Sequence, residues 1–359
     1  MAKIELQNIG HSYNPQSAEQ IYALNPFNMT WEDGGRYAIL GPSGCGKTTM
    51  LNIMSGIVQP SEGNLLFDGV DVTKLSTSER NIAQVFQFPV IYGTMSVEQN
   101  LAFPLVCRNY EKPAIDAKVN EVAEALGLQE LLTKSASRLT ADQKQLISLG
   151  RGLVRDDVAA VLMDEPLTVI DPDLKFRLRR QLKEINQKYR STLIYVTHDQ
   201  NEAMTFAENV IVMDAGRIVQ VGTPKELFER PKTTFVGYFI GAPAMNFFRC
   251  ERDGDYSLRF GGNTITTQTS LTELSASQLK LGIRSKYIKI VDTIGQNTIP
   301  ARVKRVEDLG NHKLVSAVSN ELDIKVKVHR DTAIPAEQVH LDLPAENCCV
   351  YADEILVQN

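Results

Sequence analysis

The sequence lacks the features that would mark a secreted, membrane-spanning or nucleic-acid-binding protein. Its five cysteines show neither a paired framework nor the spacing of metal ligands, which favours a reducing compartment. No uninterrupted apolar run is long enough to cross a membrane, and Glu5 stands where a signal peptide would be apolar. The net charge of −5 counts against a nucleic-acid surface. If the protein works at a membrane, we expect it to do so through partner subunits.

The pattern of apolar runs predicts two domains. Up to about residue 242, buried strands alternate with helices, which is typical of a largely parallel α/β sheet. After residue 243 the segments are short and β-rich, and turns such as Gly261-Gly262-Asn263 separate them. We therefore expect an α/β domain over residues 1–242 and a small all-β, barrel-like domain over residues 243–359.

Residues 41–49 have the glycine-x4-glycine-lysine-threonine spacing of a phosphate-binding loop. An apolar run at residues 37–40 predicts a strand before the loop, and residues 50–54 predict a helix after it. Glycines let backbone N–H groups surround phosphate oxygens, and the helix N-terminus adds positive charge. Lys47 can reach the outer phosphates, and the Thr48 hydroxyl can ligate Mg²⁺. A chance glycine-rich turn is the alternative, but the flanking pattern favours a nucleoside triphosphate site. The predicted phosphate-loop contacts are Gly41, Ser43, Gly44, Cys45, Gly46, Lys47, Thr48 and Thr49.

The apolar strand at residues 159–163 ends in two carboxylates. Asp164 stands where an aspartate supports Mg²⁺ through its water ligands. Glu165 is placed to polarise a water that attacks the γ-phosphate. A solvated pair of carboxylates is the alternative, and the phosphate loop upstream makes it the weaker one.

Three further side chains are candidates for the same site. His198 follows a buried strand at residues 192–196 and can contact the γ-phosphate and hold the attacking water, although a lone histidine is more often structural. Gln87 can contact Mg²⁺ or a water from a loop that follows a core strand. Tyr13 can stack on an adenine face. Ordinary surface positions are the alternative for Gln87 and Tyr13.

Together these motifs resemble the ATPase subunit of an ABC transporter. The resemblance covers about the first 240 residues and adds a signature region at residues 139–143 and a D-loop at residues 168–171. It implies a P-loop NTPase with a RecA-like core and a helical subdomain at about residues 88–156, with ATP and Mg²⁺ as cofactors. The catalytic residues that it implies are Lys47, Glu165 and His198; the metal ligands are Thr48, Gln87 and Asp164; Tyr13 and Gln87 complete the nucleotide contacts.

The remainder of the chain is similar to the small OB/TOBE-type barrel of ATPases in maltose-type sugar and polyol importers. Residues 239–247 are similar to the joining segment of these ATPases, and Leu281-Gly282-Ile283-Arg284 is similar to one of their barrel motifs. The resemblance implies a peripheral protein at the cytoplasmic face of the inner (plasma) membrane that drives uptake of a sugar, a polyol or a glycerol-type solute.

The partners that the resemblance implies are transmembrane permease subunits, a second ATPase subunit and, indirectly, an extracytoplasmic solute-binding protein; no nucleic acid is expected. The permease would dock near the Q-loop at residues 88–95. An apolar cluster there is suited to a partner helix or to packing within the helical subdomain. Its members are Phe88, Val90, Ile91 and Tyr92.

The chain departs from the family at the signature, where leucine-serine-glycine-glycine-glutamine is replaced by Leu139-Thr140-Ala141-Asp142-Gln143. In family dimers the signature of one subunit closes over the ATP of the other. Thr140 and Gln143 can still form a capping box at a helix start. Asp142, however, would repel a phosphate, and like charges about 4 Å apart cost roughly 1–4 kcal/mol. We hypothesise a heterodimer in which a non-identical ATPase supplies an ordinary signature; a slower homodimer is the alternative.

Two other functions stay open. An ATP-switched regulatory subunit with weak hydrolysis would follow from the altered signature, but the presence of both Glu165 and His198 counts against it. A non-transport ABC ATPase acting on DNA or ribosomes is disfavoured by the acidic balance, the single ATPase domain and the β-rich C-terminal part.

Overall fold

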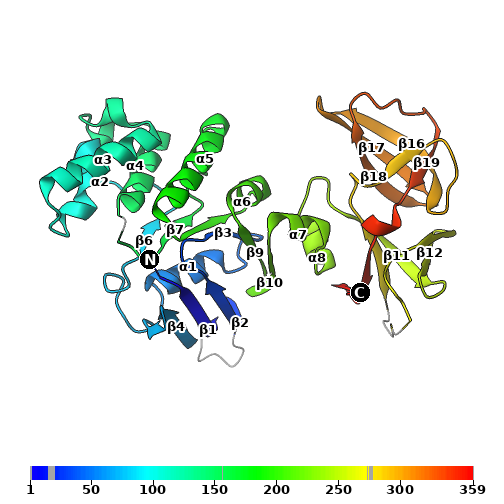
Figure 1. The fold of residues 1–359 in the computed structure, drawn as a ribbon, viewed down its shortest axis with the longest axis horizontal. Helices are drawn as coiled ribbons and strands as arrows, with labels where there is room; N and C mark the ends of the chain where they lie inside the picture. Colours follow the sequence, from blue (N-terminus) through cyan, green and yellow to red (C-terminus); the bar gives the residue numbers. More distant parts are fainter. Residues whose placement is uncertain (1, 15–20, 156, 273, 275–277, 359) are drawn as a thin grey trace. The chain divides into compact units, whose positions relative to one another are not determined.

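The computed structural model describes residues 2–14, 21–155, 157–272, 274 and 278–358. Contacts within the chain divide it into two compact units, Met1–Pro224 and Lys225–Asn359 (Figure 1). Each unit is described by itself.

A six-stranded sheet forms the centre of the first unit. In spatial order its strands are β10 (Arg217–Gly222), β9 (Asn209–Asp214), β3 (Arg36–Leu40), β8 (Leu193–Thr197), β7 (Val161–Asp164) and β6 (Ala83–Val85). All neighbours pair in parallel except β9 and β10. The largely parallel sheet expected from alternating strands and helices is therefore present.

Helices and a second sheet surround this centre. Helix α1 (Lys47–Ser55) follows β3, α5 (Pro172–Tyr189) follows β7 and α6 (Gln200–Phe206) follows β8. The second sheet is antiparallel, with strands β2 (Leu24–Trp31), β1 (Ile4–His11), β4 (Glu62–Phe67) and β5 (Val70–Asp71) in spatial order.

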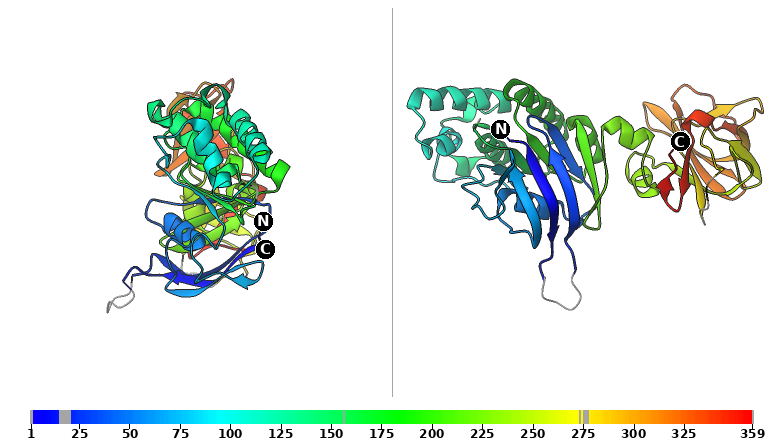
Figure 2. Two further views of the ribbon diagram at one scale, coloured as in Figure 1. Left: turned by 90° about the vertical axis from the view of Figure 1, so that its left-hand side faces the viewer. Right: turned by 60° about the horizontal axis from the view of Figure 1, so that its bottom comes forward.

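Between β6 and β7 the chain forms a helical region. It comprises α2 (Val97–Val106), α3 (Lys112–Leu126), the 3₁₀ turns η1 (Gln129–Leu131) and η2 (Ala136–Arg138), and α4 (Ala141–Leu153). Figure 2 shows it in cyan to green, apart from the blue four-stranded sheet. It corresponds to the helical subdomain expected at about residues 88–156.

The six-stranded sheet is buried on both faces, because alternate residues of its strands belong to two different cores. In β8, Leu193 and Tyr195 pack with the helical region, whereas Ile194 and Val196 pack with α1 and the four-stranded sheet. A strand that is buried on both sides must be apolar throughout, which explains the continuous apolar runs in the sequence.

The sequence around residue 171 explains where helix α5 begins. Asp171 caps it by accepting a hydrogen bond from the backbone N–H of Asp173 at 3.0 Å, and Pro172 occupies the first helical position. Leu178 and Leu182 are buried apolar side chains of this helix next to the sheet. Its exposed face carries basic side chains such as Arg177 and Arg180.

The second unit is all-β after two short helices, α7 (Pro224–Glu229) and α8 (Thr234–Phe239). One sheet has, in spatial order, β13 (Asn263–Thr266), β12 (Ser257–Phe260), β11 (Asn246–Arg252), β14 (Leu279–Ile283), β20 (Cys349–Ala352) and β21 (Ile355–Leu356). The other has β15 (Lys289–Val291), β19 (Gln338–Asp342), β16 (Thr298–Asp308), β17 (His312–Ser319) and β18 (Leu322–His329), and η3 (Ala345–Asn347) precedes β20.

Every paired strand of this unit is antiparallel, and the two sheets curl around one core that includes Phe248, Leu281 and Leu341. This arrangement is a half-barrel of the OB/TOBE type. The predicted fold class, an α/β P-loop domain followed by a small all-β barrel-like domain, is confirmed.

Arg284 explains why the structural division lies before the change in composition at residue 243. Its guanidinium is only 2 % exposed and donates hydrogen bonds to the Phe228 carbonyl at 2.7 Å and the Gly237 carbonyl at 2.8 Å. Burial lowers the pKa of Arg284 to about 10. These bonds join α7 and α8 to β14, so residues 225–242 fold with the β-rich unit rather than with the α/β unit.

Candidate functional site

The phosphate loop, residues 41–49, connects β3 to α1, as its sequence context predicts. Gly46 caps the helix with φ 102°, and a Cβ there would lie 2.6 Å from the Ala23 carbonyl oxygen. A Cβ on Gly41 would lie 2.3 Å from the Met213 carbonyl oxygen. Neither position can hold a side chain without a shift of the backbone, so both glycines let the loop pack closely against Met213 and Ala23.

Lys47 is buried within this loop. Its Nζ donates hydrogen bonds to the Gly41 carbonyl at 2.8 Å and the Pro42 carbonyl at 2.9 Å, which holds the ammonium group at the base of the loop. Burial raises the pKa of the neighbouring Cys45 thiol, so this cysteine stays protonated at neutral pH. The more open positions of the loop are Ser43, Gly44 and Thr48.

Two oxygen donors suited to Mg²⁺ meet at the end of β7. Asp164 is buried, and this burial raises the pKa of its carboxylate, whereas the nearby Thr48 side chain lowers it. A buried carboxylate beside a hydroxyl fits a hard divalent cation, which prefers oxygen ligands and compensates the buried charge.

Glu165 lies at the meeting point of three segments. Its Oε1 is 3.0 Å from Nδ1 of His198, and its Oε2 accepts a hydrogen bond from Nε2 of Gln87 at 3.4 Å. The structure thus brings together the predicted general base, the predicted histidine and the Q-loop glutamine. A carboxylate held by a histidine and an amide can orient and polarise a water molecule.

The backbone of Glu165 has a left-handed conformation, with φ 46°. Its N–H donates to the Val196 carbonyl of β8 at 2.9 Å, which continues the parallel ladder one residue past β7. The chain turns immediately afterwards. A non-glycine residue in this conformation is uncommon, and such residues cluster at functional sites.

Tyr13 lies beside the phosphate loop with an exposed ring. Its hydroxyl is 3.1 Å from Oγ1 of Thr49, and its ring packs edge-on against His11 at 4.6 Å between ring centroids. The accessible ring is suited to stacking.

Glu202 is a site-supporting residue that the sequence analysis missed. It is 4 % exposed on α6, where its Oε2 accepts hydrogen bonds from the hydroxyls of Thr197 at 2.8 Å and Tyr195 at 2.9 Å. Thr197 directly precedes His198, and Lys175 of α5 lies 3.3 Å from Oε1 of Glu202. Glu202 therefore fixes the end of β8 that presents His198. No local pattern distinguishes it from a surface glutamate.

The sequence analysis did not predict two further contacts of the site. The Thr168 hydroxyl lies 3.1 Å from the Glu165 carbonyl oxygen and 3.4 Å from its Oε2, so the D-loop directly contacts the predicted base. Gln145 is fully buried on α4 and donates to the Phe86 carbonyl at 3.0 Å and the Pro166 carbonyl at 2.9 Å. The sequence signal for this link between α4 and the site was a glutamine on the apolar face of an amphipathic helix.

The signature residues form the N-terminus of α4. Gln143 Oε1 accepts a hydrogen bond from the Thr140 N–H at 3.2 Å, as expected for a capping box, and the Thr140 hydroxyl contacts the Asp142 carboxylate. Ala141, Asp142 and Gln143 occupy the first turn. Within the described part of the chain, no hydrogen bond joins these residues to residues 41–49. The Thr140 hydroxyl, which would face a phosphate, thus has the Asp142 carboxylate beside it.

The apolar cluster after β6 is divided between surface and core. Phe88 is 71 % exposed, and Val90 and Tyr92 are also exposed, whereas Ile91 packs against the core of the helical region. A groove of about 220 Å³ runs beside Val90 and is lined by Phe86, Pro104 and Arg151, among other residues. The exposed residues of the cluster are therefore suited to docking, and Ile91 is suited to packing. Among the described residues, no helix is both long and apolar enough to span a membrane.

Comparison with known protein sequences identifies relatives over nearly the whole chain. The sequence profile described as ABC transporter matches residues 24–168. The multiple sugar-binding transport ATP-binding protein MsmK of Streptococcus mutans is 36% identical over 93% of this chain and 94% of its own length. The trehalose import ATP-binding protein SugC of Mycobacterium tuberculosis is 36% identical over 97% of this chain and 91% of its own.

Solved structures match the α/β part. The cbiO1 protein of Clostridium perfringens, part of the ABC transporter complex cbiONQ, has a TM-score of 0.57 at 28% identity and covers 63% of this chain and 90% of its own. The ATP-binding cassette MJ0796, in a dimeric post-hydrolysis state with ADP and Pi, has a TM-score of 0.56 at 26% identity over 62% of this chain and 98% of its own.

Proposed function

This chain belongs to the family of ABC transporter ATP-binding proteins, and on that basis we propose that it powers the uptake of a small solute through separate membrane subunits. As a member of that family it binds ATP and hydrolyses it. The observation that carries the proposal is the convergence of His198 and Gln87 on Glu165, one residue past the strand that ends at Asp164.

The residues divide the chemistry as follows. Backbone amides of residues 41–49 and the Lys47 ammonium hold the phosphates, while Tyr13 stacks on the adenine. Glu165 accepts the proton of the attacking water, and His198 holds that water and the γ-phosphate. Mg²⁺ would be held by Thr48, by Gln87 and, through water, by Asp164; when bound it neutralises charge on the phosphates.

The exposed apolar residues near the Q-loop support docking of a membrane subunit. Phe88 and Val90 would contact an apolar helix of a permease, and Arg151 at the groove beside Val90 offers it a charged partner. Gln87 lies next to this surface and touches Glu165, so movement of the permease would reach the predicted base directly. We place the protein at the cytoplasmic face of the inner (plasma) membrane, held there by its partners.

The cargo is proposed to be a sugar, a polyol or a glycerol-type solute. The proposal rests on the relatives, among them a multiple sugar-binding transport protein, a trehalose importer and the oligosaccharide import protein MsmX of Bacillus subtilis. A solute-binding protein outside the membrane would deliver the cargo to the permease.

We further propose that the ATPase works as a heterodimer. Asp142 and Thr140 are already paired with each other at the N-terminus of α4, which leaves a carboxylate where a partner's γ-phosphate would arrive. A second ATPase with an ordinary signature would complete the site formed by Lys47, Glu165 and His198. Rapid ATP hydrolysis by the purified chain alone, with no second ATPase present, would contradict the proposed heterodimer.

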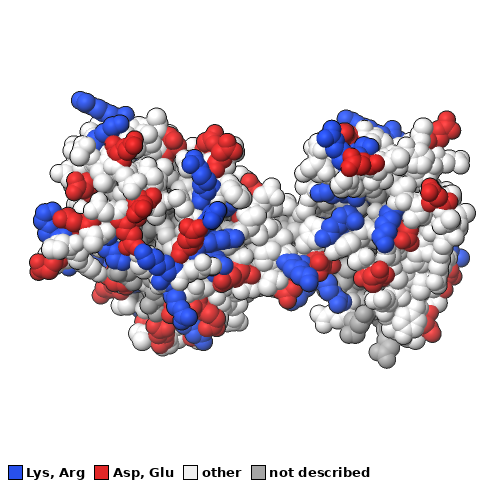
Figure 3. Space-filling model, turned by 45° about the horizontal axis from the view of Figure 1, so that its top comes forward, with Lys and Arg blue, Asp and Glu red and all other residues white. Residues whose placement is uncertain are grey.

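A regulatory subunit with weak hydrolysis and a non-transport ATPase are less well supported. The contact between Glu165 and His198 is intact, which a purely regulatory subunit does not need. On the face seen in Figure 3, basic and acidic side chains are interspersed on both units, whereas a nucleic-acid surface gathers basic ones.

The deciding experiment is reconstitution. The chain, its genetically neighbouring permeases and any neighbouring second ATPase would be placed in proteoliposomes, and ATP-dependent uptake of labelled glycerol and trehalose measured. We expect uptake of at least one solute by the complete set, and none when the chain carries Lys47→Ala. Co-purification with ribosomes or DNA, with no association with the permeases, would contradict the proposal.

A further inference from the structure

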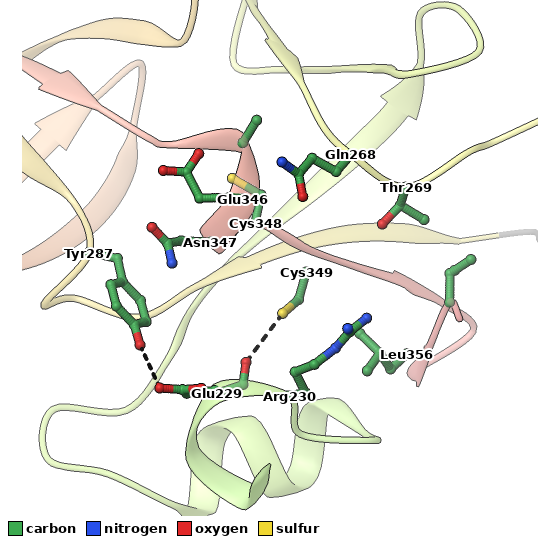
Figure 4. A pocket seen from close by; sticks show the side chains of 12 residues that line it. Glu229, Arg230, Gln268, Thr269, Tyr287, Glu346, Asn347, Cys348, Cys349 and Leu356 are labelled. Carbon is green, nitrogen blue, oxygen red and sulfur yellow. Dashed lines mark hydrogen bonds between the residues drawn. The ribbon is translucent and has the colours of Figure 1, made fainter. Parts of the chain in front are cut away.

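A pocket of about 260 Å³ opens on the β-rich second unit (Figure 4). Five segments meet at it: the end of α7, the loop after β13, the turn between β14 and β15, η3 with the start of β20, and the end of β21. The polar side chains at the pocket include Glu229, Arg230, Gln268, Tyr287, Glu346 and Asn347.

The wall of the pocket is rich in hydrogen-bonding groups. Tyr287 donates its hydroxyl to Oε1 of Glu229 at 3.3 Å, and Oε2 of Glu229 lies 4.0 Å from Nζ of Lys225. The Glu229 carboxylate is thus held in place and partly compensated. The amides of Gln268 and Asn347 add donors and acceptors from the other side (Figure 4).

The two thiols at the back of the pocket are not reactive groups. Burial raises the pKa of Cys348 to about 12, and burial also raises the pKa of Cys349, whose Sγ donates to the Glu229 carbonyl oxygen at 3.7 Å. Thiols that stay protonated at neutral pH are poor nucleophiles and poor metal ligands. The two thiols therefore do not support a covalent or metal-binding role for this pocket.

We propose that this pocket binds a small neutral polyhydroxy compound, a polyol or a monosaccharide. Its volume equals roughly nine waters at about 30 Å³ each, which suits a molecule between a three-carbon polyol and a hexose. An anion would face Glu229 and Glu346, and a cation would face Arg230. Hydroxyl groups both donate and accept, so they match the carboxylates, amides and guanidinium without adding charge.

This site lies outside the nucleotide-binding residues and does not depend on which solute is transported. The test uses the purified full chain in buffer free of glycerol, with glycerol and glucose as probes and isothermal titration calorimetry as the readout. Glucose 6-phosphate serves as the anionic counterpart of glucose. We expect saturable binding of at least one neutral probe and weaker binding of the phosphorylated one.

Substitution then locates the site. Gln268 is exposed, so Gln268→Ala should leave the fold intact, and it should raise the Kd of the neutral probe about tenfold by removing one hydrogen-bonding group. Asn347→Ala should act in the same direction. Gln296→Ala, an exposed amide outside the pocket, is the matched control and should have no effect. Far-UV circular dichroism and the Tm of the β-rich unit report that each variant is folded.

Three results would overturn the proposal: no saturable binding of glycerol or glucose, binding that Gln268→Ala leaves unchanged, or binding of glucose 6-phosphate at least as tight as that of glucose. The last result would reject the neutral class of ligand in particular.

Discussion

Nδ1 of His198 lies 3.0 Å from Oε1 of Glu165. The contact joins the ends of β8 and β7, which are neighbours in the parallel sheet. Because strands in a parallel sheet end at one edge, residues far apart in sequence meet there, and the phosphate loop leaves the same edge after β3. Glu165 is therefore held at that edge by two side chains, His198 after β8 and Gln87 after β6.

Glu165→Gln should abolish most hydrolysis while nucleotide binding persists. The amide keeps the shape of the side chain and its contact with Gln87, but it cannot accept a proton. General-base catalysis contributes on the order of 10²–10⁴ in rate, so kcat of the assembled transporter should fall by that factor. Steady-state ATPase assays and equilibrium binding of a fluorescent ATP analogue would check this. A parallel loss of nucleotide affinity would mean that Glu165 holds the nucleotide rather than the water.

Glu202→Gln should lower kcat through His198. The substitution weakens the bonds that fix Thr197, and small misplacements of catalytic groups cost up to about 100-fold. We expect kcat to fall roughly 10- to 100-fold with KM for ATP nearly unchanged. In a His198→Ala background the same change should have little further effect, because the group that it positions is gone. Glu184→Gln on the exposed face of α5 is the control; additive losses in the double variant would argue against positioning.

Asp142→Asn should raise the ATPase activity of the chain assayed by itself. The amide removes the charge but keeps the size, and relief of a repulsion of roughly 1–4 kcal/mol allows a gain of about fivefold or more. Asp173→Asn is a matched control, because Asp173 occupies the equivalent first-turn position of α5. An unchanged rate for Asp142→Asn would indicate that the carboxylate does not limit closure of a homodimer.

Asp164→Asn should stabilise the fold as it inactivates the enzyme. Burial raises the folded-state pKa of Asp164 above its unfolded value, so the ionised carboxylate opposes folding at neutral pH, and this penalty disappears as the pH falls through the folded pKa. The variant should therefore have a higher Tm than the wild type at neutral pH, and the difference should shrink on acidification.

Thermal melts of the nucleotide-free protein at several pH values would measure this effect, with Asp292→Asn as an exposed control. A lower Tm for Asp164→Asn at neutral pH would show that the hydrogen bond from Thr48 outweighs desolvation.

Arg284→Lys should loosen α7 and α8. An ammonium group cannot reach the Phe228 and Gly237 carbonyls together as the guanidinium does. The Gly237 carbonyl still accepts from the Met245 N–H, but a buried carbonyl left unpaired costs about 1–3 kcal/mol. Hydrogen exchange of residues 225–240 should become faster, while amides of the phosphate loop keep their rates. Arg302→Lys, at an exposed position, is the control. Unchanged exchange would mean that other contacts, such as the hydrogen bond from the Thr234 N–H to the Glu354 carbonyl, are enough to hold the two helices.

The parts of the molecule that the sequence predicts are those with a local physical cause. The phosphate loop is recognisable because Gly41 and Gly46 satisfy close backbone approaches that only glycine tolerates. Helix α5 could be bounded because Asp171 and Pro172 supply a cap and a fixed φ at its start. Buried strands could be placed because both faces of the sheet require apolar side chains.

The parts that could not be predicted depend on contacts between distant segments. Glu202 is a polar residue on a short helix, and only the packing of α5 and β8 around it makes it a buried anchor. The division after residue 224 also depends on such contacts: α7 and α8 resemble a continuation of the α/β pattern, whereas hydrogen bonds from Arg284, which lies far along the chain, help to attach them to the β-rich unit.

The hydrogen bonds from Arg284 to α7 and α8 also determine which stretch of sequence can be exchanged between related ATPases by recombination. A recombination crossover near residue 243 would give the buried guanidinium two helices from another lineage, whose carbonyls need not stand where Phe228 and Gly237 present theirs. A crossover just before Pro224 would carry the cation and its acceptors together. Where related ATPases have exchanged C-terminal units, we therefore expect the recombination junctions to lie upstream of α7.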